Sequence, residues 1–265
     1  MTRHTAEIEV ATNAVKEAAE LYMRDRKASK DKDSPVGTYD VVSENDILAE
    51  KMIKESISKA FPDDSFICEE SGDDIHSDRR WIIDPIDGTI NYVHGIPVFG
   101  TQVALTEGDE PLISVMFLPT CDEMYVAESG CGATMNGRKL DMRHTVEMKK
   151  SILSIGDYSR GSIEFRENQS RLMDVLRDRI GRIKMMGSSC YDFCMFASGR
   201  VDYHTRFIRN PWDFVPGFLL AKESGAVFDG DLYERKKLYI AACSEENLAS
   251  ITETINSEMV WYSDG

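Results

Sequence analysis

The pattern of secondary-structure signals changes near residue 150, and no other feature of the sequence constrains the fold as strongly. Before that point, the strand-like runs "VFGTQVALT", "LISVMFL" and "EMYVAE" are joined by short turns, which predicts an antiparallel meander. After it, strand-like and helix-like runs alternate. We therefore expect an N-terminal α+β half over residues 1–148 and a C-terminal α/β half over residues 149–265.

Amphipathic helices are predicted on both sides of this change. Apolar residues recur at helical spacing from residue 5 to about 26, and a second helix is expected after Ser43, a good N-cap followed by Asp46 at the third helical position. Asp213 is expected to cap one of the helices of the second half. The helices predicted there cover residues 163–178, 189–198, 213–223 and 245–257.

The composition excludes several classes of function. The chain has 31 basic and 46 acidic residues, a formal net charge of −15, so its surface repels nucleic acid and anionic lipid. Its six cysteines lack both the paired spacing of a zinc site and the density of a secreted disulfide scaffold, and we expect free thiols. No apolar run approaches the roughly 20 residues of a membrane span. These features predict a cytoplasmic protein without a nucleic-acid or membrane partner.

The segment "WIIDPIDGTINY" places Asp84 and Asp87 directly after an apolar run and directly before Gly88 and Thr89. Two ionised carboxylates at the end of a buried strand are unfavourable unless a cation or strong hydrogen-bond donors compensate them, and oxygen ligands suit Mg²⁺. Gly88 would let the backbone approach a phosphate closely, with the N–H groups of Gly88 and Thr89 as donors. Taken alone, "DPIDGT" is explained equally well as a turn.

Other acidic residues end predicted strands or begin predicted helices. Glu69 and Glu70 follow "FIC", Asp213 lies in "NPWD", and Asp46 lies in "SENDILAE". Singly, each would be a surface acid or a helix cap. If they converge, they form a site for two or three divalent metal ions.

Three segments, "FICEES", "WIIDPIDGTINYVHGIP" and "NPWD" followed by "ESGAV", resemble in order and spacing the inositol monophosphatase family of Mg²⁺-dependent, lithium-sensitive phosphatases. The resemblance covers nearly the whole chain. It implies that Glu69, Asp84 and the carbonyl of Ile86 bind one Mg²⁺ ion, and that Asp84, Asp87 and Asp213 bind a second, with two or three ions in all. It also implies that Thr89 and Glu69 activate water, with Asp46 orienting Thr89.

The same resemblance implies a layered α-β-α-β-α sandwich, a homodimer and a substrate pocket. The phosphate would contact Gly88 and Thr89, and Asp213 would lie near substrate hydroxyls. The segment "MMGSSCYDF" resembles a family segment that lines this pocket, so that Gly187, Ser188 and Ser189 are candidate substrate contacts.

Arg206 departs from the family pattern. Seven residues before Asp213, inositol-specific and histidinol-phosphate members usually carry Glu, so the charge is reversed here. Arg206 would attract a second phosphate or a carboxylate and disfavour a cationic substrate. Alternatively, it points to solvent or pairs with a surface acid.

We therefore predict an enzyme, a Mg²⁺-dependent phosphomonoesterase of the inositol-1-monophosphatase type. It would hydrolyse a small polyol or sugar phosphate by direct in-line attack of a metal-activated water. Within the family, the alternatives are histidinol-phosphate, fructose-bisphosphate and nucleotide-bisphosphate phosphatases. From other classes, the alternatives are a non-catalytic phosphate-binding regulatory protein and a phosphatase with an Asp nucleophile, although the latter's D-x-D spacing differs from D-P-I-D.

Overall fold

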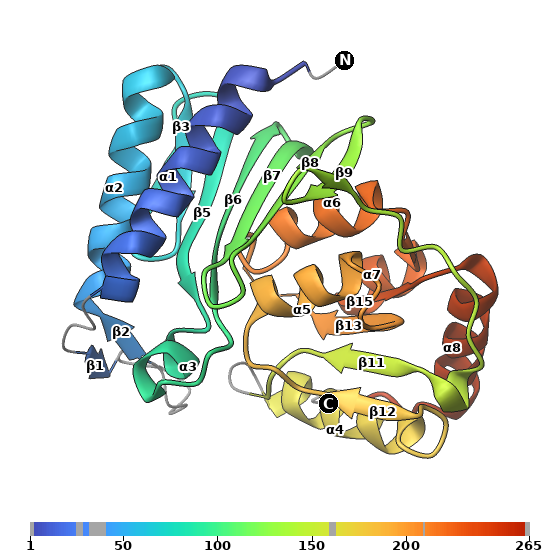
Figure 1. Cartoon of the computed structure of the whole chain (residues 1–265). Coiled ribbons are helices and arrows are strands. Elements are labelled where there is room, and N and C mark those ends of the chain that lie inside the picture. Colours follow the sequence, from blue (N-terminus) through green and yellow to red (C-terminus); the bar gives the residue numbers. More distant parts are fainter. Residues whose placement is uncertain (1–2, 25–28, 32–40, 159–162, 209, 263–265) are drawn as a thin grey trace.

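The structure, a computed structural model, describes residues 3–24, 29–31, 41–158, 163–208 and 210–262. Helices and sheets alternate in five layers (Figure 1), which confirms the predicted α-β-α-β-α sandwich. The first layer contains α1 (Thr5–Arg24) and α2 (Glu44–Ala60). Helices α5 (Ser189–Ala197) and α6 (Val215–Glu223) lie between the two sheets.

The larger sheet has eight strands in the order β10-β9-β8-β7-β6-β5-β3-β4. From β5 to β10 every neighbouring pair is antiparallel, so the predicted meander is present, while β3 pairs parallel with β5. The strands are β3 (Ser65–Cys68), β4 (Gly72–Asp74), β5 (Arg79–Asp87), β6 (Gly100–Glu107), β7 (Glu110–Leu118), β8 (Glu123–Glu128), β9 (Gly132–Met135) and β10 (Arg138–Lys139). A short pair, β1 (Ser29–Asp31) and β2 (Val41–Ser43), lies apart from this sheet.

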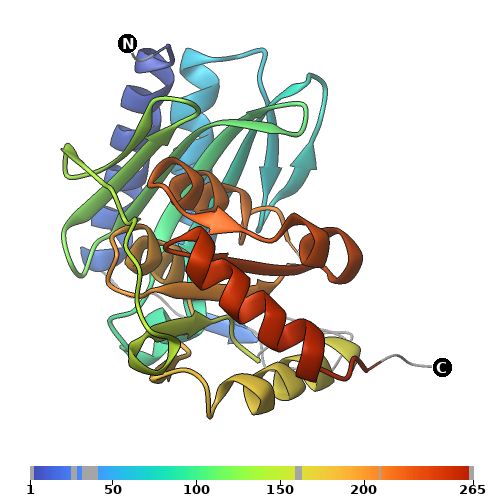
Figure 2. The ribbon, with the colours of Figure 1, turned by 90° about the vertical axis from the view of Figure 1, so that its right-hand side faces the viewer.

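The smaller sheet has five strands in the order β12-β11-β13-β15-β14. It is mixed, because β11 pairs parallel with β12 and β13, whereas β15 pairs antiparallel with β13 and β14. The strands are β11 (Ile152–Ile155), β12 (Arg182–Lys184), β13 (Tyr203–Phe207), β14 (Val227–Phe228) and β15 (Leu238–Ala242). Helix α4 (Ile163–Leu176) and helix α8 (Glu245–Glu258) form the outermost layer, and Figure 2 shows α8 crossing in front of these strands.

Apolar residues fill the spaces between the layers. Small side chains on one face of α1, such as Ala11 and Ala18, are fully buried and let α2 and the large sheet approach closely around Trp81. Phe193 and Leu219 belong to a second core around α5 and α6. A third core lies under α4 and α8. Within the described part of the chain, every helix is too short or too polar to cross a lipid bilayer.

Several local predictions need correction. Helix α6 begins at Val215 with Phe214 at its N-cap position, so Asp213 does not cap it. Helix α7 (Gly230–Lys236) was not predicted, nor was the 3₁₀ turn Met148–Lys150. The two sheets do divide the chain between β10 and β11, but that the parts before and after residue 148 are separate domains stays a prediction.

Candidate active site

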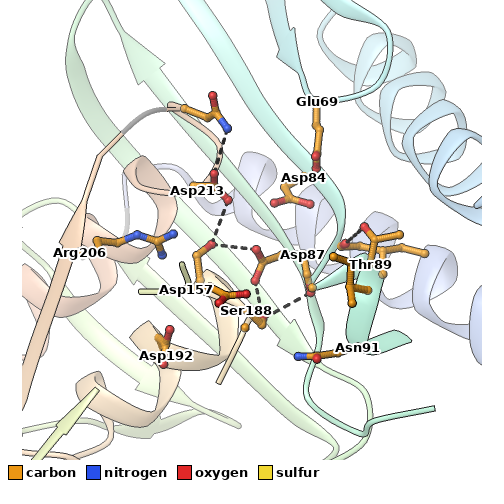
Figure 3. Close-up of a pocket in the computed structure, with 16 residues that line it drawn as sticks. Glu69, Asp84, Asp87, Thr89, Asn91, Asp157, Ser188, Asp192, Arg206 and Asp213 are labelled. Atoms are coloured by element: carbon orange, nitrogen blue, oxygen red, sulfur yellow. Dashed lines mark hydrogen bonds between the residues drawn. The ribbon is translucent and has the colours of Figure 1, made fainter. Parts of the chain in front are cut away.

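Four of the acidic residues singled out in the sequence, Glu69, Asp84, Asp87 and Asp213, line one pocket (Figure 3). They come from the end of β5, the turn after β3 and the segment before α6. Asp46 contacts Thr89 from outside the pocket lining. The other predicted site residues all line the pocket, namely Glu69, Asp84, Ile86, Asp87, Gly88, Thr89, Gly187, Ser188, Ser189, Arg206 and Asp213.

A bulge in β5 explains how Asp84 and Asp87 face the same side. In a regular strand, residues three apart point to opposite faces. Here Asp84 pairs with Gln102 and Asp87 with Gly100, so three residue steps on β5 match two on β6. The extra residue rotates the strand locally and brings both carboxylates into the pocket.

The carboxylates of Asp84, Asp87 and Asp213 lie close together, with one oxygen from each within 4.8 Å of the others. Burial raises the pKa of Asp84 well above its ordinary value, and the negative charges of Glu69 and Asp87 add to the rise. Burial also raises the pKa of Asp87, and the carboxylate of Asp213 adds to it. Oδ1 of Asp84 is buried and has no hydrogen-bond partner among the described residues. A hard cation would compensate this buried negative charge.

Helix α5 holds the carboxylate of Asp87. The amide of Cys190 donates to Oδ2 at 2.6 Å and the hydroxyl of Ser189 donates to Oδ1 at 2.9 Å, while Ser188, the N-cap residue, also donates to Oδ2. An anion at a helix N-terminus is favourable. Ser188 and Ser189 therefore bind Asp87 in this structure, and their predicted role as substrate contacts stays a prediction.

Thr89 and Asp46 form a second hydrogen-bonded unit. Thr89 Oγ1 lies 3.0 Å from Asp46 Oδ1 and 2.9 Å from the carbonyl oxygen of Ile86, so its single proton has two acceptors. Asp46 Oδ2 accepts from the amide of Ser43 at 2.9 Å and completes the capping box of α2. Asp46 thus caps a helix with one oxygen and contacts Thr89 with the other.

The turn after β5 requires glycine. Gly88 has φ of 87°, and helix α3 (Thr89–His94) begins directly after it. A Cβ on Gly88 would lie 3.0 Å from Cβ of Ser188 and 3.1 Å from the carbonyl oxygen of Val98. Both the backbone conformation and the space exclude a larger residue.

Four further polar residues line the pocket and were not predicted, and Asn91 of α3 is one of them. Asp157 follows β11, Asp192 lies in the first turn of α5, and Asn210 Nδ2 donates to Asp213 Oδ2 at 3.1 Å. Burial raises the pKa of Asp192 to about 8, although Ser154 donates a hydrogen bond to its carboxylate. The rule that found Asp84, an acid directly after a predicted strand, would also have found Asp157.

The sequence is similar to that of known proteins from one family. Residues 3–260 match the sequence profile of the Inositol monophosphatase family. A protein of Aquifex aeolicus named fructose-1,6-bisphosphatase/inositol-1-monophosphatase is 34% identical over 206 residues, 76% of each chain. The inositol-1-monophosphatase of Rhizobium meliloti is 37% identical over 194 residues, 71% of each chain.

Among solved structures, the extragenic suppressor protein suhB of Bartonella henselae superposes with a TM-score of 0.86 at 27% identity, covering 96% of this chain and 100% of that one. The fold and the sequence match together define a phosphoric monoester hydrolase. The chain belongs to the inositol monophosphatase family.

Proposed function

We propose that the protein is a Mg²⁺-dependent phosphomonoesterase that hydrolyses small polyol or sugar phosphates of the inositol 1-phosphate type. The main support is the group formed by Asp84, Asp87 and Asp213, which each place one carboxylate oxygen within 4.8 Å of the others. One of these carboxylates, that of Asp84, has a buried oxygen without a hydrogen-bond partner among the described residues. Carboxylates of like charge at this distance need a proton or a cation to relieve their repulsion, and an all-oxygen donor set fits Mg²⁺.

Five residues would hold two or three Mg²⁺ ions. These are the carboxylates of Glu69, Asp84, Asp87 and Asp213 and the carbonyl oxygen of Ile86, all of which line the pocket. When bound, the ions would lower the pKa of water and neutralise charge on the phosphate. Hydrogen bonds from α5 fix the carboxylate of Asp87 before any ion arrives, so this part of the site is preorganised.

The chain's own residues would position water and phosphate. With Asp46 Oδ1 accepting the Thr89 proton, the lone pairs of Thr89 Oγ1 would accept a hydrogen bond from the attacking water, and Glu69 would take its proton. The amides of Gly88 and Thr89 would bind the phosphate oxygens. Water would attack phosphorus directly as the bond between phosphorus and the ester oxygen breaks, and the leaving alkoxide would take a proton from solvent. The phosphate would not be transferred to an Asp.

We also propose a cytoplasmic location and a homodimer. All six cysteines are described and none forms a disulfide, as predicted, and four of them are buried, which suits a reducing compartment. The homodimer follows from the family resemblance alone, and a sedimentation measurement tests it.

Phosphate release from inositol 1-phosphate tests this function. We expect turnover only with Mg²⁺, and a loss of at least about a hundredfold in Asp87→Asn, the order seen when a group that stabilises transition-state charge is removed. Turnover in ¹⁸O water should place one labelled oxygen in the released phosphate. Unchanged hydrolysis in Asp87→Asn would refute the proposal. A trapped aspartyl phosphate would favour an Asp nucleophile, and phosphate binding without turnover would favour a regulatory protein.

A further inference from the structure

The active-site pocket adjoins a second cavity, and Arg206 lines both. We call this second cavity the distal lobe. Asp157 and Asp213 also line both cavities, so the distal lobe begins beside the metal-binding acids. Arg166 of α4 lines the distal lobe but not the first pocket, so two arginines line the distal lobe.

The guanidinium of Arg206 is not neutralised by the acids around it. Its Nη1 atom is buried and has no hydrogen-bond partner within the described ranges, and no carboxylate oxygen of those ranges lies within the 4.0 Å of an ion pair. The charge still acts at a distance, since it opposes the rise that burial causes in the pKa of Asp87 and of Asp192. A buried charged donor without a partner is unfavourable, which indicates that a ligand completes this group.

The fold fixes the position of Arg206. It lies in β13, and a Cβ on Gly156, which follows the neighbouring strand β11, would lie 2.9 Å from Cβ of Arg206. The guanidinium lies over the ring of Phe193, 5.9 Å from its centre. Figure 3 shows the side chain pointing into the pocket towards Asp157 and Asp213. A side chain held in this way is ready to bind two oxygens of one phosphate or carboxylate through two parallel N–H donors.

We propose that Arg206 binds a second anionic group of the substrate, a phosphate or a carboxylate, and that the protein prefers phosphate esters that carry such a group away from the reacting phosphate. This inference rests on the proposed phosphatase function and names the substrate class for that site. A neutral polyol phosphate would leave Nη1 unpaired, and a site built to bind a polar group discriminates strongly against an analogue without it. Arg166 adds positive charge, whereas the exposed Asp157 opposes the anion.

Matched pairs of esters test the inference at one free Mg²⁺ concentration. Fructose 1,6-bisphosphate against fructose 1-phosphate tests a second phosphate, and 2-phosphoglycerate against glycerol 2-phosphate tests a carboxylate. We expect kcat/KM to favour the doubly anionic member of at least one pair. The pair that shows the preference identifies the second group.

Arg206→Gln should reduce that preference by about ten- to a hundredfold, the range expected for hydrogen bonds to a charged group. The loss should fall mainly on KM, because the group is bound equally in the ground and transition states. Arg206→Lys should retain part of the preference, and Asp157→Asn should increase it. Arg138→Gln, which removes an exposed charge on β10, is the matched control and should leave the preference unchanged.

Three outcomes overturn the inference in different ways. If Arg206→Gln slows both members of each pair equally, Arg206 serves only as an internal counter-charge to the pocket acids, while the phosphatase function stands. If the wild-type protein hydrolyses inositol 1-phosphate but none of the four esters, this inference fails while the phosphatase function stands. If it hydrolyses neither inositol 1-phosphate nor the four esters, the proposed function fails and this inference fails with it.

Discussion

Two clusters of potential metal ligands occur among the described residues, and they differ in how their charges are satisfied. The first cluster is Asp84, Asp87 and Asp213, and the second is His144, Asp202 and Cys243. In the second, His144 Nε2 lies 2.6 Å from Asp202 Oδ1, and the amide of Ile152 donates to Asp202 Oδ2 at 2.7 Å. In the first, like charges face one another and one buried oxygen has no partner among the described residues.

This difference shows that distance alone does not define a metal site. The second cluster contains its own cation, since His144 Nδ1 lies 2.8 Å from the carbonyl oxygen of Met142 and Nε2 faces a carboxylate, an arrangement that two N–H donors satisfy. It ties the segment before β11 to β13. The first cluster has excess negative charge that the described residues do not neutralise. Of the two, only the first therefore has an excess of negative charge that a bound cation would relieve.

We expect the largest difference between the two clusters when one Asp of each is changed to Asn. Asp84→Asn should reduce phosphatase activity by at least about a hundredfold, because a charged ligand is lost. Asp202→Asn should leave activity within a few-fold of wild type. In the absence of metal the stability effects should have opposite signs. Asp84→Asn should raise the urea concentration at the midpoint of unfolding, because repulsion among the carboxylates of the first cluster is reduced. Asp202→Asn should lower the free energy of unfolding by about 1 kcal/mol. Equal effects of the two changes would contradict the comparison.

The sequence predicted the elements whose signals are local. Helix α8 was expected over 245–257 and runs to Glu258, and α5 was expected over 189–198 and ends at Ala197, because Ser244 and Ser188 supply caps and the apolar spacing is clear. Helix α7 has only seven residues, and one side-chain hydrogen bond caps its N-terminus, from the amide of Leu232 to Asp229. A sequence pattern of this length cannot be distinguished from that of a turn.

The site was harder to predict, because it depends on contacts between distant segments. The bulge between Asp84 and Asp87 is set by pairing with β6, and the parallel pairing of β3 with β5 is equally non-local. Asp213 looked like a cap because it directly precedes an apolar helix, but the helix begins at Val215 and Asp213 instead accepts a hydrogen bond from Asn210. That these acids meet came from the family resemblance and could not be derived from local patterns.

Adding Mg²⁺ should produce the next largest difference between the two clusters. At a concentration a hundred times its dissociation constant, a ligand stabilises the folded state by about 2.7 kcal/mol, which corresponds to a rise in Tm of about 5 to 10 °C for a chain of this size. Thermal unfolding should show this rise in wild type and in Asp202→Asn, and little of it in Asp84→Asn. A full shift in Asp84→Asn would place the ion elsewhere.

The effect of Mg²⁺ should depend on pH in a defined direction. Because the pKa values of Asp84 and Asp87 are raised, protons compete with the ion at higher pH than they would for ordinary carboxylates. Both the Mg²⁺-induced rise in Tm and the activity should therefore decrease as the pH falls through these raised values.

In the metal-free protein, the stability should depend on pH in the opposite direction. Protonation relieves the repulsion, and the metal-free protein should gain stability as the pH falls towards the ordinary value of 3.8.

The smallest effect concerns the second cluster and its histidine. The hydrogen bond to Asp202 raises the pKa of His144 above its ordinary value of 6.5. The pair should therefore stabilise the fold fully below about pH 6.5 and lose this contribution as the pH rises through the raised value. Since the His144 side chain is 39% exposed, we expect the pair to contribute no more than about 1 kcal/mol to the stability of the fold.

Urea unfolding at pH 5.5 and at pH 8.5, with EDTA present, tests this contribution. The urea concentration at the midpoint of unfolding should decrease less between these pH values in His144→Gln than in wild type. His76→Gln, which removes an exposed histidine 3.6 Å from Asp74, is the matched control. If both variants decrease as wild type does, the second cluster does not titrate in this range, and its difference from the first cluster rests on hydrogen bonding alone.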